Sequence, residues 1–217
     1  MVLDEQRKNV DPILTSIAKR FVNVNPDIFT WASALFAFLA GVFFYFSSPA
    51  LELTNYYLYG AVIFVTLNGL FDAIDGKVAK LANKTSKRGD FLDHAIDRYA
   101  DVFMVGGLAL SPWCRYNIIG FLAIVGMLLT SYMGTQAQAI GFKRDYSGVL
   151  GRADRLALLI ITPIIQHILL QYQNFKTIGN LYLLEWVLFY FAVMGNTTAV
   201  QRFFSTLLWF KEKNHKK

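Results

Sequence analysis

This sequence contains little cysteine and shows no apparent secretion signal. The 217 residues include one cysteine, Cys114, so no disulfide can form within the chain and the redox compartment is left open. The first 25 residues mix charged and polar side chains without an apolar core, so we expect no cleavable signal peptide. No repeat or low-complexity tract divides the chain. We therefore expect one domain over residues 1–217, with no separate soluble catalytic domain.

Apolar side chains are abundant, at 55% of the residues, with aromatic residues at 16%. A helix that spans a membrane needs about 20 mostly apolar residues. Strand-like alternation is weak, and helices satisfy their own backbone hydrogen bonds in hydrocarbon. The fold class predicted is thus an all-α integral membrane protein, with a six-helix bundle within residues 25–209. The six predicted spans are 28–47, 56–80, 90–110, 117–140, 153–171 and 181–209.

Positive charge is scarce in every second loop. Of the 21 Lys and Arg residues, only Arg115 and Lys176 fall in the loops 47–55, 111–116 and 172–180. The positive-inside rule places these loops outside and both termini in the cytoplasm, as in a multi-pass protein of the cell membrane. Topology and anionic lipid headgroups explain the net charge of +6, so membrane lipids are expected as partners and nucleic acid is not.

Residues 10–24 predict a short amphipathic helix before the first span. Lys19 and Arg20 lie off its apolar stripe, which suits a helix on the inner membrane surface. A helix that packs on the protein instead is the alternative. In 25-NPDIFT-30, a proline in the first turn and an acid at the positive helix end predict the start of the first span. The stripe consists of Ile13, Leu14, Ile17, Ala18 and Phe21.

Four acids lie in the stretches 72-DAIDGKVAK-80 and 89-GDFLDHAID-97. Asp72 and Asp75 are three residues apart and Asp93 and Asp97 four, so each pair shares a helix face. The loop 81–88 lets the two helices run antiparallel and bring the pairs together at their inner ends. Four facing carboxylates need positive charge between them. Oxygen ligands suit Mg²⁺, Mn²⁺ or Ca²⁺, and we expect two ions, as in sites for in-line displacement at phosphorus.

Nearby residues refine this interpretation. Gly69 and Ala73 are typical of close helix packing. Gly76 and Ala79 indicate a bare backbone surface that admits a ligand. His94 follows a site acid but points about 100° away from it, so we expect an ordinary helix-face residue. A purely structural ion-pair cluster is the alternative, although few bases share these helix faces.

The spacing D-x₂-D-G-x₂-A-x₉-G-x₃-D-x₃-D resembles the signature of the CDP-alcohol phosphotransferases, membrane enzymes of phospholipid synthesis. The resemblance implies six membrane helices, an inner-surface amphipathic helix and a homodimer. It also implies a reaction in which an alcohol attacks the lipid-bound phosphorus of a CDP-linked lipid and CMP leaves. Lys80 stands where the family has Arg, which keeps the charge but loses the bidentate grip on phosphate.

The resemblance implies roles for the motif residues. Asp97 is the implied catalytic residue for the acceptor hydroxyl. Because a carboxylate that touches a divalent ion is a weak base, we expect Asp97 mainly to orient that hydroxyl. The implied ligands of Mg²⁺ or Mn²⁺ are Asp72, Asp75, Asp93 and Asp97, and the implied CDP-binding residues are Asp72, Gly76, Ala79, Lys80 and Gly89.

Arg152 and Arg155 begin the fifth span, where a helix N-terminus and two guanidinium groups favour an anion. Positive-inside anchoring is the alternative. A second phosphate site indicates a phosphorylated acceptor. The run G-R-A-D-R-L is similar to that of the phosphatidylinositol-phosphate and archaetidylinositol-phosphate synthases. Residues predicted to bind the acceptor phosphate are Arg152, Arg155, Gln136 and Lys143, with Arg144 as a further source of charge.

The predicted function is transfer of a lipid phosphoryl group from CDP-archaeol or CDP-diacylglycerol to a polyol phosphate. Inositol phosphate is the preferred acceptor and glycerol 3-phosphate the alternative. In the relatives' run, charged residues stand where this chain has Gly134, Gln136 and Gln138, although amides still bind polyol hydroxyls. A cation transporter is a distant alternative. In a transporter the acids would lie near mid-membrane on broken helices, whereas here they are predicted at the inner helix ends.

Overall fold

The computed structural model describes residues 7–142, 148, 150–172 and 177–215. Within them the secondary structure is helical, apart from one isolated bridge between Ile178 and Leu181, so the all-α prediction is confirmed there. The α-helices are α1 (Arg7–Lys19), α2 (Pro26–Phe46), α3 (Tyr56–Leu81), α4 (Lys87–Ala109), α5 (Asn117–Ala139), α6 (Arg152–Leu169) and α7 (Leu183–His215), with a 3₁₀ helix η2 (Pro49–Thr54) between α2 and α3.

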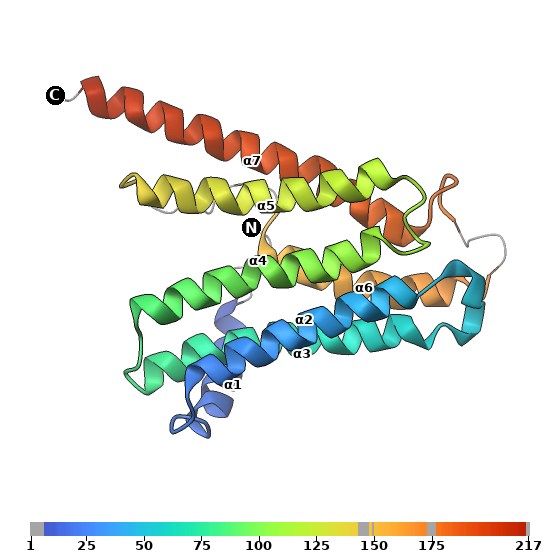
Figure 1. The fold of residues 1–217 in the computed structure, drawn as a ribbon, viewed down its shortest axis with the longest axis horizontal. Coiled ribbons are helices and arrows are strands. Elements are labelled where there is room, and N and C mark those ends of the chain that lie inside the picture. Colours follow the sequence, from blue (N-terminus) through green and yellow to red (C-terminus); the bar gives the residue numbers. More distant parts are fainter. Residues whose placement is uncertain (1–6, 143–147, 149, 173–176, 216–217) are drawn as a thin grey trace.

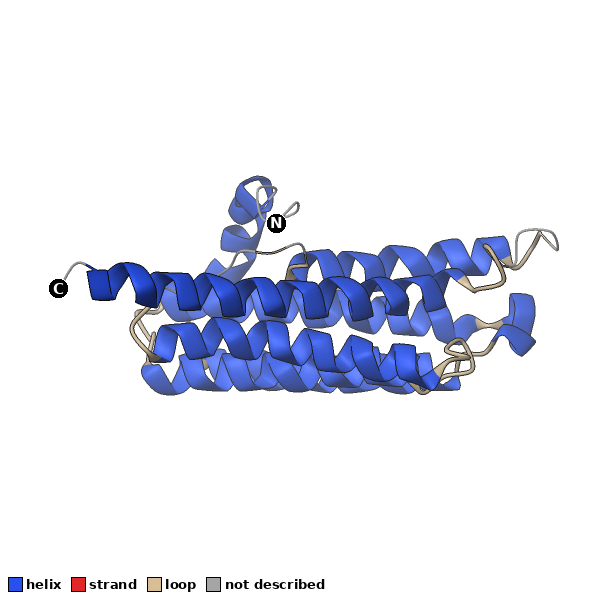
Figure 2. Ribbon diagram, turned by 90° about the horizontal axis from the view of Figure 1, so that it is seen from above, coloured by secondary structure: helices blue, strands red, loops and turns tan. Residues whose placement is uncertain are grey.

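Helices α2 to α7 lie side by side along one direction, and the chain reverses from each to the next (Figure 1). Helix α2 packs against α3 and α4, α5 against α7 and α4, and α6 mainly against α3. Helix α1 projects from the side of this bundle (Figure 2). Helix α1 therefore runs across the bundle axis, and its place on the inner membrane surface stays a prediction.

Each predicted span coincides with a helix of the bundle. Among the described residues, four helices are long and apolar enough to cross a membrane: α2, α3, α5 and the part of α7 from Leu183 to Lys211. Helices α4 and α6 fall short because they carry the charged residues of the site, yet they lie alongside the other four (Figure 1). The chain is thus a membrane protein with several apolar helices, while six spans and cytoplasmic termini stay predictions.

Two helix starts follow from caps that the sequence contains. Helix α2 starts at Pro26, as 25-NPDIFT-30 predicts, and the Asn25 side chain accepts a hydrogen bond from Asp27 N. Helix α4 starts three residues before the predicted range because Ser86 caps it, accepting from Gly89 N–H at 3.0 Å.

The predicted range 10–24 for the amphipathic helix is wrong at its C-terminal end. Helix α1 ends at Lys19, and residues 20–24 form turns. The backbone must be extended at Asn25 to precede Pro26, which ends the helical run early. Ala18 is fully buried against α2 and α3 with Phe29 and Val78, so part of the apolar stripe packs inside the protein.

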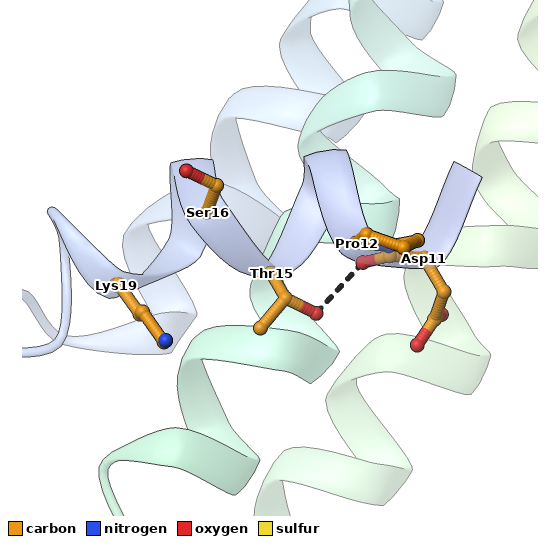
Figure 3. Close-up of a pocket in the computed structure, with 5 residues that line it drawn as sticks. All are labelled: Asp11, Pro12, Thr15, Ser16 and Lys19. Carbon is orange, nitrogen blue, oxygen red and sulfur yellow. Dashed lines mark hydrogen bonds between the residues drawn. The ribbon is translucent and has the colours of Figure 1, made fainter. Parts of the chain in front are cut away.

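Helix α1 is held on α3 by polar contacts as well. Lys77 Nζ lies 2.6 Å from Asp11 Oδ2 and donates to Thr15 Oγ1 at 3.2 Å. Asp11 and Thr15 lie on the same side of α1, among the residues that line a surface pocket (Figure 3). Ile13 remains 63% exposed and available to lipid. Helix α1 therefore packs on the protein with one side and presents apolar side chains with another.

The backbones of α2 and α4 touch where two glycines meet. A Cβ on Gly107 would lie 2.1 Å from Gly41 O, and one on Gly41 would lie 2.3 Å from Phe103 O. No side chain fits between these helices at this point, so small residues fix their separation.

Replacing Gly107 tests this contact. Gly107→Ala should destabilise the protein by about 1–3 kcal/mol, because the added methyl group overpacks against backbone that cannot move aside. Thermal unfolding in detergent measures the change. The matched control is Gly106→Ala, whose Cβ would lie 3.9 Å from Ile124 Cδ1 and should be neutral or slightly stabilising. Equal melting temperatures for the two variants would contradict the close approach.

Candidate functional site

The four predicted acids meet between α3 and α4. Oxygen atoms of Asp72, Asp75 and Asp93 lie within 4.8 Å of one another, and so do ligand atoms of Asp93, His94 and Asp97. Asp93 belongs to both groups. We call these five residues, namely Asp72, Asp75, Asp93, His94 and Asp97, the acidic cluster.

The acidic cluster lies further from the helix ends than the sequence suggests. Asp72 precedes the end of α3 at Leu81, and Asp97 follows the start of α4 at Lys87, by about two and a half turns each. At 1.5 Å per residue this is roughly 14 Å along each helix. The predicted position at the inner helix ends therefore fits Asp75 and Asp93 better than Asp72 and Asp97.

Helix α6 sends an arginine into the acidic cluster. Arg152 Nη1 lies 2.8 Å from Asp72 Oδ1 and also contacts Asp97 Oδ1. Arg98 Nη2 lies 3.5 Å from Asp97 Oδ2. These cations neutralise part of the acidic charge, which the ion-pair alternative requires. They pair with Asp72 and Asp97 and leave Asp75 without an ion pair among the described residues.

The second arginine of α6 contacts a different acid. Arg155 is 4% exposed, and its Nη2 donates to Asp101 Oδ2 at 2.8 Å. Between the arginines, Asp154 accepts from Gly151 N–H at 3.1 Å and so caps α6. Asp154 therefore fixes the start of the helix that carries both arginines.

The other predicted site residues surround the acidic cluster unevenly. Gly76 is exposed, and a Cβ there would meet nothing within 4 Å, so its backbone is open as expected for ligand contact. Ala79 is half-buried and Lys80 exposed on α3, while Gly89 N–H takes part in the cap of α4. Gln136 is exposed on α5. Lys143 and Arg144 lie outside the described residues, and the binding roles of all these residues stay predictions.

The expectation that His94 faces away from the acids is wrong. Its Nδ1 lies 3.7 Å from Asp93 Oδ2 and its Nε2 lies 3.4 Å from Asp90 Oδ1. The angle of about 100° relates Cα directions, and the imidazole turns back toward its own helix face. Its spacing from Asp90 and Asp97, four and three residues, could have indicated this position.

Thr30 of α2 is a second residue that the sequence did not single out. Its Oγ1 donates to Asp75 Oδ2 at 2.7 Å, and both residues are buried. The motif does not indicate this contact, because Thr30 lies on α2 and the motif begins on α3.

The acidic cluster fits a hard divalent cation. Its donors are carboxylate oxygens with one imidazole nitrogen, a set that suits Mg²⁺ and Mn²⁺. The side chains of Asp72 and Asp93 are 21% and 38% exposed, so an ion can reach them from solvent.

Comparison with known proteins shows which family the sequence matches. A sequence model described as CDP-alcohol phosphatidyltransferase matches residues 23–198, which include the acidic cluster and both arginines of α6. Among known proteins, the archaetidylinositol phosphate synthase of Pyrococcus horikoshii is 28% identical over 165 residues, covering 75% of this chain and 82% of the relative.

Two crystal structures of phosphatidylinositol phosphate synthase from Mycobacterium tuberculosis share the fold. The structure with CDP-DAG bound has a TM-score of 0.69 and 22% identity, covering 90% of this chain and 94% of the other. The structure in complex with manganese and citrate has a TM-score of 0.68 and 23% identity, covering 89% and 88%. At this identity the likeness supports the fold.

Asp93→Asn tests whether the acidic cluster binds metal. Because Asp93 belongs to both groups of ligand atoms, its loss should weaken Mn²⁺ binding by more than the roughly 10–100-fold that loss of a supporting residue costs. Electron paramagnetic resonance of free Mn²⁺, titrated with purified protein, measures this. Asp90→Asn removes a 71% exposed acid of the same helix and should change little. Equal effects of the two substitutions would remove Asp93 from the site.

Proposed function

The chain belongs to the CDP-alcohol phosphatidyltransferase family, a membrane transferase group of phospholipid biosynthesis, and we propose that its substrates are a CDP-linked lipid and a polyol phosphate. The enzyme transfers the lipid phosphoryl group to the polyol phosphate and releases CMP. The acidic cluster is the observation that carries this proposal, since it joins acids of α3 and α4 into adjoining ligand groups.

Inositol phosphate is the proposed acceptor. The Pyrococcus relative is named an archaetidylinositol phosphate synthase, and the structural neighbours are phosphatidylinositol phosphate synthases. The donor is accordingly CDP-archaeol or CDP-diacylglycerol, the second being bound in one neighbour. Glycerol 3-phosphate is the alternative acceptor, because the chemistry at the lipid phosphorus is the same.

The proposed metal ligands are Asp72, Asp75, Asp93 and Asp97, holding Mg²⁺ or Mn²⁺ as one or two ions. Ions held there would neutralise the diphosphate and favour the deprotonated form of the acceptor hydroxyl. Asp97 orients that hydroxyl for in-line attack on the lipid-bound phosphorus. The new P–O bond forms as the P–O bond to CMP breaks, CMP leaves with the bonding electrons, and the hydroxyl proton passes to Asp97 or to water.

The nucleotide is proposed to lie along the exposed side of α3. Gly76 offers backbone with open space beside it, and Ala79 follows one turn later. Exposed Lys80 supplies charge to the nucleotide phosphates at the end of the helix. Asp72 and Gly89 complete the proposed CDP contacts.

Arg152 and Arg155 are proposed to bind the acceptor phosphate, together with Gln136 and Lys143. The Nε atoms of both arginines are buried and lack a hydrogen-bond partner among the described residues, so each retains a donor. Arg152 is the better placed, because it touches Asp72 and Asp97 and its side chain is 20% exposed. An acceptor phosphate held there would put its polyol beside Asp97.

The cation-transporter alternative loses support. Helices α3 and α4 run unbroken through the acids, whereas intramembrane ion sites of transporters commonly interrupt their helices. The family assignment also makes the chain a transferase. We further propose that it is a homodimer in the cell membrane with the acidic cluster open to the cytoplasm, since basic residues gather at that end of the predicted bundle.

An acceptor panel tests the substrate assignment. Purified protein with Mn²⁺ and either CDP-archaeol or CDP-diacylglycerol should release CMP with inositol phosphate, more slowly with glycerol 3-phosphate, and not with serine. CMP is measured by chromatography. CMP release with serine but with neither phosphorylated acceptor would refute the proposed acceptor class.

Arg152→Gln tests the acceptor site. Loss of one charge-assisted hydrogen bond, about 1.5–3 kcal/mol, should raise KM for inositol phosphate by roughly 10–100-fold and change KM for the CDP-lipid much less. Steady-state CMP release measures both constants. The control is Arg20→Gln, which removes the same charge from an exposed residue just after α1, far from Arg152 in the sequence, and should leave both constants unchanged.

Equal increases in both KM values would deprive Arg152 of its proposed role. Arg155→Ala is a poorer probe because it leaves Asp101, which is 3% exposed, without its nearest cation. Breaking such a buried pair costs about 3–5 kcal/mol.

A further inference from the structure

Helix α2 buries two small polar side chains in an otherwise apolar surface. Thr30 is 6% exposed and Ser33 is fully buried. Buried polar groups are costly without partners, so their contacts explain their presence. Ser33 Oγ donates to Thr30 O at 2.8 Å within α2, and Asn68 Nδ2 of α3 donates to Ser33 O at 3.0 Å.

These contacts fix α2 on the face of α3 that carries Asp75. Asn68 and Asp75 are seven residues apart, which is two helical turns, so both face α2. The Asn68 contact holds the α2 backbone at Ser33, and Thr30 lies one turn away, level with Asp75. The position of the Thr30 hydroxyl is thus set by the packing of two helices.

The Thr30 hydroxyl has one hydrogen to give. Its candidate acceptors are Asp75 Oδ2 at 2.7 Å and Pro26 O at 3.5 Å, so the hydrogen goes to Asp75. A length of 2.7 Å is that of a well-formed O–H···O hydrogen bond. The bond uses one lone pair of Oδ2 and leaves lone pairs of the carboxylate for a cation.

Asp75 depends on this bond more than the other acids do. Asp72 and Asp97 pair with Arg152, and Asp93 lies beside His94. Asp75 has no ion pair among the described residues and is 5% exposed, so water does not orient it freely. The Thr30 hydroxyl is therefore the side-chain group of a neighbouring helix that orients this carboxylate, beside the backbone of Gly76 on α3 itself.

We infer that Thr30 is a positioning residue of the metal centre, whose hydroxyl fixes the Asp75 carboxylate so that one oxygen faces the cation. The inference rests on the proposed function, since it assumes that the acidic cluster holds a divalent ion. Groups that orient a metal ligand commonly contribute 10–100-fold to metal affinity or activity.

Two substitutions separate the hydroxyl from the shape of the side chain. Thr30→Val keeps the shape and removes the hydroxyl, and Thr30→Ser keeps the hydroxyl. Mn²⁺ binding to the purified protein without substrates is measured by electron paramagnetic resonance. Thr30→Val should weaken binding by roughly 10–100-fold, and Thr30→Ser should remain close to the unsubstituted protein. The Mn²⁺ concentration for half-maximal CMP release should shift in the same way, with little change in kcat at saturating Mn²⁺.

Thr130→Val is the matched control. Thr130 is 3% exposed on α5, and its Oγ1 donates to Gly195 O of α7 at 2.7 Å, so the variant also loses a short buried bond between helices. It should leave Mn²⁺ affinity unchanged. Melting temperatures without metal show whether the variants fold, and Thr30→Ala replaces Thr30→Val if that variant does not give monodisperse protein.

The outcomes are distinct. Unchanged Mn²⁺ affinity in Thr30→Val, or an equal loss in Thr30→Val and Thr30→Ser, overturns the role of the hydroxyl. An equal loss in Thr130→Val overturns it too, because general loosening of the bundle would then explain the effect. Failure of the unsubstituted protein to bind Mn²⁺ overturns the metal centre itself, and with it the inference.

Discussion

Electrostatic repulsion among acids within a helical bundle is the constraint on which the rest of the structure depends. Asp72 and Asp75 lie on α3, a helix apolar enough to cross a membrane, and they meet Asp93 and Asp97 of α4 inside the bundle. Burying such groups without compensation costs several kcal/mol per ion. The surrounding helices supply that compensation with arginine from α6, a hydroxyl from α2 and an imidazole from α4 itself.

Helix α6 shows how the compensation shapes the fold. It has 18 residues, begins part-way along the bundle and carries its cations in the first turn (Figure 1). Because α6 begins at this level, Arg152 reaches acids that lie about two and a half turns inside α3 and α4, while Arg155 and Asp101 join the same helix to α4.

The sequence predicts features that local rules determine. Spacing within one helix groups Asp72 with Asp75 and Asp93 with Asp97. The proline of the first turn, Pro26, and the acid that follows it predict the start of α2. The residue pattern does not encode contacts between distant helices, so it gives no sign of the contact between Thr30 and Asp75. Helix spacing fixes the Cα direction of His94 but not the rotation of its imidazole, which turns toward the acids. The apolar stripe of α1 continues beyond Lys19, whereas the helix ends there ahead of the extended backbone at Asn25.

The glycine contact between α2 and α4 also bears on the site. Gly107 lies ten residues beyond Asp97, about 15 Å along α4, and faces backbone at Gly41. Helix α2 also carries Thr30, which donates to Asp75, so the helix spacing that the two glycines allow is part of what places that hydroxyl. A substitution far from the acids can therefore disturb them without touching them.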